Sequence, residues 1–312
     1  MDSEPPQLRV TLAFITLVLI WSSTPLAVVL SLRDLEAVWS LAIRMLLAAV
    51  VAQLILRVSG LRLDLSRNAV HSYLIGALSM FGAMFFTYLG ARHLPSGLIS
   101  ILFGASPLLV GILSVALLPG TRLPPNQWLG MALGLVGLVF MFAPSGQGGR
   151  IDPLSVFYVV CGVSSYAISA IFMRRRRQAL EPLMQTTGAL WVSLLGCLLV
   201  LPFFRASMPT HMPHWISLTA LLYSASFGSI AAMLCYFYLL RRVEASTVAL
   251  TTLINPVFAL GLGMLINHER FQAHTVVGMA LIFGGLLLYY ARELERFRAG
   301  RRRSAVLAEQ KG

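Results

Sequence analysis

The chain has 312 residues, of which 57% are hydrophobic and 12% are charged, whereas soluble domains average roughly 45–50% apolar and about 25% charged residues. This composition excludes an ordinary soluble enzyme. The formal net charge is +12, but the basic residues follow the ends of apolar runs, which indicates a membrane protein and not a nucleic-acid-binding one.

Ten apolar segments are long enough, or nearly so, to cross a bilayer, whose hydrocarbon core of about 30 Å requires about 20 helical residues. We expect spanning helices near 11–31, 38–56, 71–91, 96–118, 127–143, 154–173, 183–204, 215–240, 246–266 and 275–291. They leave only short connections and a basic tail over 292–312. The sequence therefore predicts an all-α integral membrane protein, and the acidic start with Asp2 and Glu4 predicts a retained first helix, not a signal peptide.

Basic residues are distributed unevenly between the two sets of loops. With ten spans, eighteen Lys and Arg residues fall on the side of the two termini and five on the other side. The positive-inside rule therefore places both termini in the cytoplasm. We expect the arginine clusters at 174–177 and 292–303 to contact anionic lipid at that face, not nucleic acid. The large excess of arginine over lysine is typical of a GC-rich genome and favours a bacterial inner membrane.

The sequence indicates no cofactor, metal site or disulfide framework. Cys161, Cys197 and Cys235 lie inside predicted spans, without CxxC pairs or Cys/His spacing. No Asp, Glu or His lies in the middle of a span, which argues against a buried proton relay. Glu269, at an outer helix end, could sense protons, but we expect an ordinary solvated loop residue there. Proton antiport, exchange and facilitated diffusion all remain open.

The two halves of the chain resemble each other. Residues 88–107 align with 237–256 at a constant offset of 149, and Gly-Met-Ala-Leu at 130–133 recurs at 278–281. Each copy contains five predicted spans, and an odd number reverses the second copy in the bilayer, so 11–143 and 154–291 are expected to form inverted repeats. Such repeats are typical of secondary transporters, which hold their substrate near the midplane and expose it on alternate sides.

Several landmarks occur in order along the chain. They are residues 20–25 (IWSSTP), residues 43–49 (IRMLLAA), and the helices of Pro107 and Pro256, each followed by a glycine-rich span. Together they resemble the EamA family of the drug/metabolite transporter superfamily over nearly the whole chain. The resemblance implies a ten-helix secondary carrier with a central cavity, often an exporter of amino acids or related metabolites. The chain departs from the family pattern because only the second half has the glutamate after the fourth helix, Glu269.

Two proline-containing helices at equivalent positions mark the candidate binding site. Pro107 and Pro256 each remove a backbone donor inside a span, and Ser106 and Asn255 place a polar side chain beside the freed backbone. We expect the substrate cavity here, with packing as the alternative role for each residue. The residues expected to line it are Trp21, Ser22, Ser23, Met84, Tyr88, Ser100, Phe103, Ser106, Pro107, Ser165, Tyr166, Met233, Phe237, Thr252, Asn255 and Pro256. An aromatic and sulfur-rich lining suits a partly apolar solute such as a neutral amino acid.

Arg44 is the one charged residue well inside a predicted span, and the second half offers only Gln185, Thr186 and Thr187 near the corresponding place. An unpaired charge costs about 2.5–3.5 kcal/mol at the bilayer centre and less nearer the interface. Arg44 could clamp an anion or a carboxylate of the substrate. The sequence favours the other interpretation, in which it extends outward or pairs with Asp34, Glu36 or carbonyls at a helix end.

The sequence therefore predicts a secondary transporter that moves a small metabolite, an amino acid or a related compound, with export as the expected direction. A sugar or nucleotide-sugar carrier is the alternative within the superfamily, although phosphates would require more cavity-facing basic residues. An intramembrane enzyme, from a different class, would need a nucleophile with a base or a metal cluster inside the spans, and neither is present. Glycines at 130, 134, 278, 284 and 285 predict close helix contact, within the chain or between the protomers of a homodimer.

Overall fold

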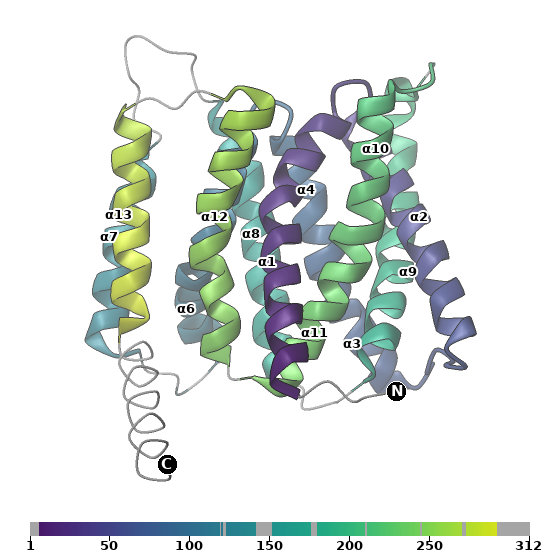
Figure 1. The fold of residues 1–312 in the computed structure, drawn as a ribbon, viewed down its shortest axis with the longest axis horizontal. Helices are drawn as coiled ribbons and strands as arrows, with labels where there is room; N and C mark the ends of the chain where they lie inside the picture. The colour runs from purple at the N-terminus through teal and green to yellow at the C-terminus, as the bar shows by residue number, and fades with distance from the viewer. Residues whose placement is uncertain are drawn as a thin grey trace. The chain divides into compact units, whose positions relative to one another are not determined.

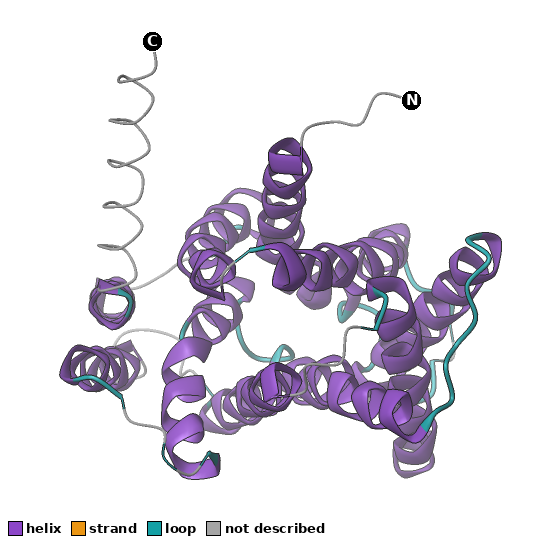
Figure 2. Cartoon of the chain, turned by 90° about the horizontal axis from the view of Figure 1, so that it is seen from below, coloured by secondary structure: helices purple, strands orange, loops and turns teal. Residues whose placement is uncertain are grey.

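The computed structural model describes residues 6–118, 120, 123–141, 152–175, 180–209, 211–243, 245–269 and 273–291. These residues form helices and connecting loops, with no strand among them (Figure 2). Seven helical stretches are long and apolar enough to cross a membrane, and shorter apolar helices cover Pro125–Phe140, Ile254–Asn267 and Ala273–Tyr289. Large apolar side chains such as Leu54 and Leu199 are exposed, as expected where helices face lipid. The predicted all-α membrane architecture is confirmed.

The helices of the first half follow the predicted order (Figure 1). Two of the predicted spans are interrupted: α3, η1 and α4 make up the third, and α5 and α6 the fourth. The bounds are α1 (Pro6–Ser31), α2 (Ala37–Val58), α3 (Arg67–Ala77), η1 (Leu78–Gly82), α4 (Ala83–Gly90), α5 (Ser96–Gly104), α6 (Ser106–Leu117) and α7 (Pro125–Met141).

The second half repeats this order. Its third span is again interrupted, by η3 between α10 and α11, whereas α12 continues through Pro256. The bounds are α8 (Pro153–Arg175), α9 (Pro182–Val200), η2 (Leu201–Ser207), α10 (Trp215–Tyr223), η3 (Ser224–Ala231), α11 (Ala232–Arg242), α12 (Ala245–Asn267) and α13 (Ala273–Tyr289).

Local sequence explains where several helices begin. Prolines stand at the first position of α7, α8 and α9, where the missing N–H would have no intrahelical acceptor. Asp152 precedes α8 and accepts hydrogen bonds from the backbone of Leu154 and Ser155 and from the Ser155 hydroxyl. The Ser155 bond, in particular, lowers the pKa of the Asp152 carboxyl below its ordinary value. The carboxylate therefore stays charged and supports this helix start.

The third span of each half contains a π-helical segment. η1 covers Leu78–Gly82 and η3 covers Ser224–Ala231. The offset of 149 found in the sequence maps 78–82 onto 227–231, so the two segments coincide in the repeats. A π turn holds an additional residue and therefore changes which side chains share a face beyond it. Both repeats thus carry the same local irregularity at the same depth.

Corresponding helices of the two halves contact each other. α2 packs on α9, α5 on α12 and α7 on α13. A further set of contacts is matched in the two halves: α1 packs on η3 and α11, and α8 packs on η1 and α4. This pattern is the one expected when two copies of a five-span unit assemble about a pseudo-twofold axis.

Spatially, the chain divides into two compact units, each drawing helices from both halves. The first comprises residues 1–110 and 149–270 and the second comprises 111–148 and 271–312. Within the second unit, α7 packs closely on α13, where a Cβ on Gly130 would lie 2.5 Å from the carbonyl oxygen of Gly285. A Cβ on Gly137 would lie 2.7 Å from the carbonyl oxygen of Gly278. The glycines thus allow a close helix contact inside the chain.

Candidate substrate cavity

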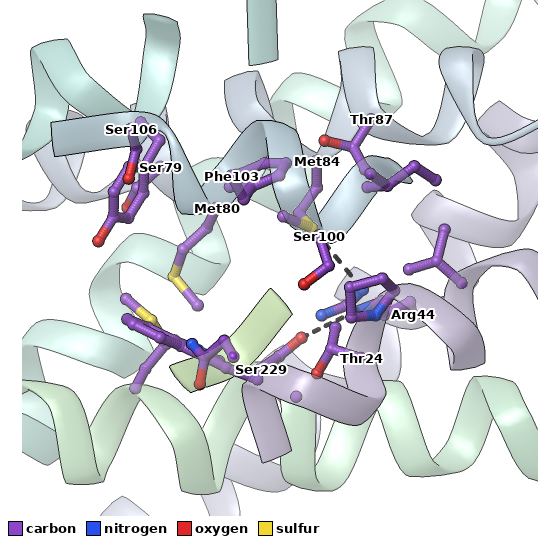
Figure 3. A pocket seen from close by; sticks show the side chains of 18 of the residues that line it. Thr24, Arg44, Ser79, Met80, Met84, Thr87, Ser100, Phe103, Ser106 and Ser229 are labelled. Atoms are coloured by element: carbon purple, nitrogen blue, oxygen red, sulfur yellow. Dashed lines mark hydrogen bonds between the residues drawn. The ribbon is translucent and has the colours of Figure 1, made fainter. Parts of the chain in front are cut away.

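A cavity of about 140 Å³ lies inside the first compact unit. Its lining comes from ten segments of both halves and combines aromatic rings, methionines and hydroxyls (Figure 3). The lining residues are Trp21, Thr24, Pro25, Val28, Arg44, Met45, Ser79, Met80, Met84, Thr87, Ile99, Ser100, Phe103, Gly104, Ser106, Tyr166, Gly228, Ser229, Met233 and Asn255. Since about 10–15 Å³ of such space admits one water molecule, the cavity can admit a small organic solute.

The two repeats contribute equivalent residues to this cavity. Four pairs of lining residues are separated by the offset of 149 that relates the repeats. The pairs are Ser79 with Gly228, Met80 with Ser229, Met84 with Met233, and Ser106 with Asn255. The first two pairs lie in the π-helical segments η1 and η3. The cavity is therefore framed by the same positions of both halves.

The structure brings about half of the residues predicted from the sequence to the cavity wall. They come from the first, third, fourth, sixth, eighth and ninth spans. These residues are Trp21, Met84, Ser100, Phe103, Ser106, Tyr166, Met233 and Asn255, together with Arg44.

Three predicted serines hold helices together and do not line the cavity. Ser22 is fully buried and donates a hydrogen bond to Asn255 Oδ1 over 3.4 Å. The Ser23 hydroxyl lies 2.6 Å from the Tyr223 hydroxyl. Ser165 donates to the backbone carbonyl of Leu78 in η1 over 2.8 Å. Ser22 thus supports a lining residue from behind, whereas the other two join α1 to α10 and α8 to η1.

Pro107 and Pro256 also lie outside the lining. α5 ends at Gly104, Ala105 has turn-like backbone angles (φ −77°, ψ 0°), and a new helix begins at Ser106. One continuous helix would place Ser100, Phe103 and Pro107 on one face, but the helix breaks at Ala105, and Ser106, not Pro107, lines the cavity. Pro256 is buried inside α12. The side chain of Thr252 lies outside the described residues.

Two predicted aromatic residues are buried beside the cavity. Tyr88 is completely buried, and its hydroxyl accepts a hydrogen bond from Arg44, which lines the cavity. Phe237 is 7% exposed and its ring packs against Tyr236, with the centroids 5.4 Å apart. Each lies one helix turn beyond a lining methionine of the same helix, Met84 or Met233.

Arg44 is 2% exposed and faces the cavity. Its Nε donates to Ser229 Oγ over 3.0 Å and its Nη1 donates to Met84 Sδ over 3.8 Å (Figure 3). Nη1 also donates to the Tyr88 hydroxyl over 3.4 Å. It is the one charged side chain among the described residues of the lining. The burial of a cation at this position, without a carboxylate partner in the described part of the chain, is the electrostatic feature that distinguishes the site.

The favoured interpretation of Arg44 from the sequence, an outward pairing with Asp34 or Glu36, is wrong. Asp34 accepts hydrogen bonds from Ser217 Oγ over 2.6 Å and from the His214 backbone N–H over 3.1 Å. The Ser217 bond, above all, lowers the pKa of the Asp34 carboxyl. Glu36 forms an ion pair with Arg92. Both acids are therefore engaged at the helix ends, away from Arg44.

Glu269 differs from its expected role as a solvated loop residue. Its carboxylate accepts hydrogen bonds from the backbone N–H and hydroxyl of Ser96 over 2.8 and 2.6 Å, and from the Gly97 N–H over 3.1 Å. It therefore caps the start of α5 from the end of α12, where a negative charge compensates the helix dipole. Asn267 adds a hydrogen bond to the same carboxylate over 3.1 Å.

Comparison with known proteins supplies the family. The model of the EamA-like transporter family matches residues 8–143 and again residues 153–291. The chain belongs to the EamA-like transporter family. As a member of this family, with ten apolar helical stretches among the described residues, it is a multi-pass membrane protein of a transporter type.

Two proteins named as transporters and one solved structure align over most of the chain. The uncharacterized transporter YoaV of Bacillus subtilis is 25% identical over 90% of this chain and 96% of its own length. The uncharacterized inner membrane transporter YedA of Escherichia coli is 25% identical over 88% of this chain and 89% of its own length. A protein crystal structure with 20% identity matches the fold with a TM-score of 0.63, over 92% of this chain and 98% of that one.

Several residues that line the cavity were not predicted from the sequence. Thr24, Pro25 and Val28 extend the α1 contribution, and Met80 and Ser229 come from the π segments. The repeat offset was a usable signal for the last two, because they stand four residues before the matched pair Met84 and Met233. Among the described residues, no group of three or more His, Cys, Asp or Glu could hold a metal ion.

Proposed function

We propose that this chain is a secondary transporter that moves a small metabolite, an amino acid or a related compound, across a bacterial inner membrane by alternating access. One observation carries the proposal: the cavity is framed by equivalent residues of two sequence-related halves. An inverted repeat can adopt two conformations in which the halves exchange roles, and these open the same site to opposite sides. Export is the proposed direction, because the EamA family that the chain resembles often exports its substrates.

Both termini are proposed to lie in the cytoplasm, because eighteen of the basic residues fall on their side of the predicted spans. The arginine clusters at 174–177 and 292–303, which lie largely outside the described residues, are proposed to contact anionic lipid there. Fusions of a reporter that is active in the cytoplasm alone should be active at both ends. Activity at one end only would contradict the inverted arrangement and with it the mechanism.

The composition of the lining favours an amino-acid-sized organic metabolite over a nucleotide sugar. Two linked phosphates carry several negative charges, and Arg44 is the one basic side chain in the described lining. Trp21, Phe103, Met80 and Met84 offer apolar surface for an aromatic or branched body.

Cysteine accessibility tests alternating access directly. We place a cysteine at Ser100, which lines the cavity and is 3% exposed, in a chain whose native cysteines are replaced by alanine. A membrane-impermeant maleimide should label it when added from either side of oriented vesicles, because the two states open the cavity alternately. A cysteine at Leu54, which is 56% exposed on the outer surface of α2, serves as the lipid-facing control. Labelling of position 100 from one side only would contradict the proposal.

A further inference from the structure

The guanidinium of Arg44 has donors left over inside the cavity. Nε and Nη1 are hydrogen bonded to Ser229, Tyr88 and Met84. Within the described part of the chain, Nη2 donates no hydrogen bond, although the side chain is 98% buried, and it is not enclosed by protein. An unused pair of N–H groups on a buried cation is costly unless a ligand or water accepts from it.

The surroundings of Nη2 leave room for such an acceptor. A Cβ on Gly228 would lie 3.1 Å from Nη2 and 3.3 Å from Thr24 Oγ1, so the absence of a side chain at 228 keeps this corner open. Figure 3 shows Thr24, Ser100 and Ser229 on the side of the cavity where Arg44 lies. The Ser100 hydroxyl makes no hydrogen bond to another described residue and so has its own donor available. The Thr24 and Ser229 hydroxyls donate to the Ile20 and Ser224 carbonyls, so Nη2 and the Ser100 hydroxyl are the donors left for a carboxylate.

Charge balance restricts what the cavity accepts. The described lining contains one positive side chain and no carboxylate. A monoanion would neutralise the site, a zwitterion would leave it with its positive charge, and an ammonium compound would place a second positive charge beside Arg44. Like charges in a desolvated site repel strongly, because little water remains to screen them. The remaining surface, including Trp21 and Phe103, is apolar or aromatic.

Resting on the proposed transport function, we propose that Arg44 binds the carboxylate of the substrate through Nη2. The cavity then selects carboxylic acids with an apolar body and no ammonium group over the corresponding free amino acids. The proposed substrate class is therefore carboxylic acids related to amino acids, in which the amino group is absent or acylated. Ser229 and Tyr88 hold the guanidinium in place, and Gly228 keeps Nη2 accessible.

The test measures binding by calorimetry to the full chain in lipid nanodiscs. Four probes share one phenylpropyl skeleton and differ in charge: hydrocinnamate (anion), phenylalanine (zwitterion), hydrocinnamyl alcohol (neutral) and phenylpropylamine (cation). We expect hydrocinnamate to bind at least tenfold more tightly than phenylalanine, and the amine most weakly. Equal or tighter binding of phenylalanine would overturn the proposal, as would the failure of hydrocinnamate to bind at millimolar concentration.

Three variants distinguish carboxylate binding from a purely structural role of Arg44. Arg44→Gln should weaken hydrocinnamate at least tenfold and leave the alcohol within twofold, which removes the preference for the anion. Gly228→Ala, which crowds Nη2 and keeps the charge, should weaken hydrocinnamate more than the alcohol. Arg92→Gln removes one positive charge at the exposed ion pair with Glu36 and should change neither.

If Arg44 only supports the fold, its replacement lowers the affinity for the anion and the alcohol alike, and the ratio between them stays constant; that outcome refutes the proposal. The binding measurement needs no transport and no gradient. The binding result can therefore be interpreted even if the accessibility experiment on Ser100 fails. A preference for the alcohol or the amine would refute the proposed substrate class and leave the proposed transport function standing.

Discussion

The glycines between α7 and α13 allow a prediction in which one methyl group decides the outcome. In Gly285→Ala the new Cβ would lie 2.5 Å from the Gly130 carbonyl oxygen and 2.7 Å from the Gly134 backbone nitrogen. Both are backbone atoms, so the helices must separate. At the neighbouring position, Gly284→Ala places its Cβ 3.5 Å from Leu133 Cδ2, which is an ordinary van der Waals contact. The two variants make the same chemical change in the same helix.

The difference between these variants isolates the clash. Both gain the helix propensity of alanine over glycine, about 1 kcal/mol, and this gain cancels in the comparison. What remains is the overpacking at position 285, typically about 1–3 kcal/mol. Since 1 kcal/mol shifts the midpoint by roughly 2–4 °C in domains of 150–250 residues, Gly285→Ala should unfold roughly 2–12 °C below Gly284→Ala.

Thermal unfolding of the two purified variants in the same detergent measures this difference. Fluorescence-detected size exclusion after heating reports the midpoint without requiring a substrate. Equal midpoints, or a higher midpoint for Gly285→Ala, would refute the close packing of α7 on α13 described here. A lower midpoint for both variants relative to the unaltered chain would locate the sensitivity in α13 as a whole and not in the contact with Gly130.

Two further predictions concern acids at the helix ends. Glu269→Gln keeps the size of the side chain but removes the charge that caps α5 through Ser96 and Gly97. The substitution should destabilise the chain by about 0.3–1 kcal/mol, measured by thermal unfolding. An unchanged midpoint would contradict the capping role. Asp34→Asn should lower the thermal midpoint by weakening the hydrogen bond to Ser217. The pKa of Asp34 in the folded chain is lowered from 3.8, so the stabilisation by its carboxylate is lost only as the pH falls through that lower value. The effect of the substitution should therefore be the same at about pH 5 and about pH 8. An effect that disappears already at pH 5 would contradict this assignment.

The spans could be predicted from composition because lipid imposes a simple requirement. A segment that crosses the hydrocarbon core must satisfy its backbone internally and present apolar side chains over about 20 residues. The predicted segment 215–240, for example, corresponds to α10, η3 and α11 over Trp215–Arg242. Helix ends agree within a few residues, since prolines and capping acids such as Asp152 mark them in the sequence.

The faces of the helices were harder to predict, because backbone irregularities change them. At a uniform turn of 100° per residue, Met80 and Phe81 both lie within about 60° of Met84, so periodicity does not choose between them, and in the structure Met80, in the π segment η1, lines the cavity. Phe81 instead packs on α9, where a Cβ on Gly196 would lie 2.9 Å from its ring. No residue type announces a π turn or the break at Ala105, since both depend on what neighbouring helices supply to the freed backbone groups.

The partners of Arg44 show why sequence proximity misleads. Asp34 and Glu36 are the nearest acids along the chain, yet Ser229 Oγ, 185 positions away in sequence, accepts the Nε hydrogen bond. A buried cation is stabilised by whichever acceptors the assembled helices bring to it, and for Arg44 these are Tyr88 and Met84 of its own half and Ser229 of the opposite half. The repeat offset of 149 gave a partial indication, because it places Ser229 at the position equivalent to Met80, which also lines the cavity.

In the proposed mechanism, residues that are matched between the two repeats and residues that are not have different consequences. The matched pairs, such as Ser106 with Asn255, can exchange environments when the halves exchange roles, so they favour neither state. Arg44 has no such counterpart, because the corresponding region holds Gln185, which is hydrogen bonded to Ser72 on both its amide atoms. A carboxylate bound to Arg44 therefore stays with α2 in both states. The Arg44–Ser229 bond joins residues of opposite halves, so we expect it to change between the two states.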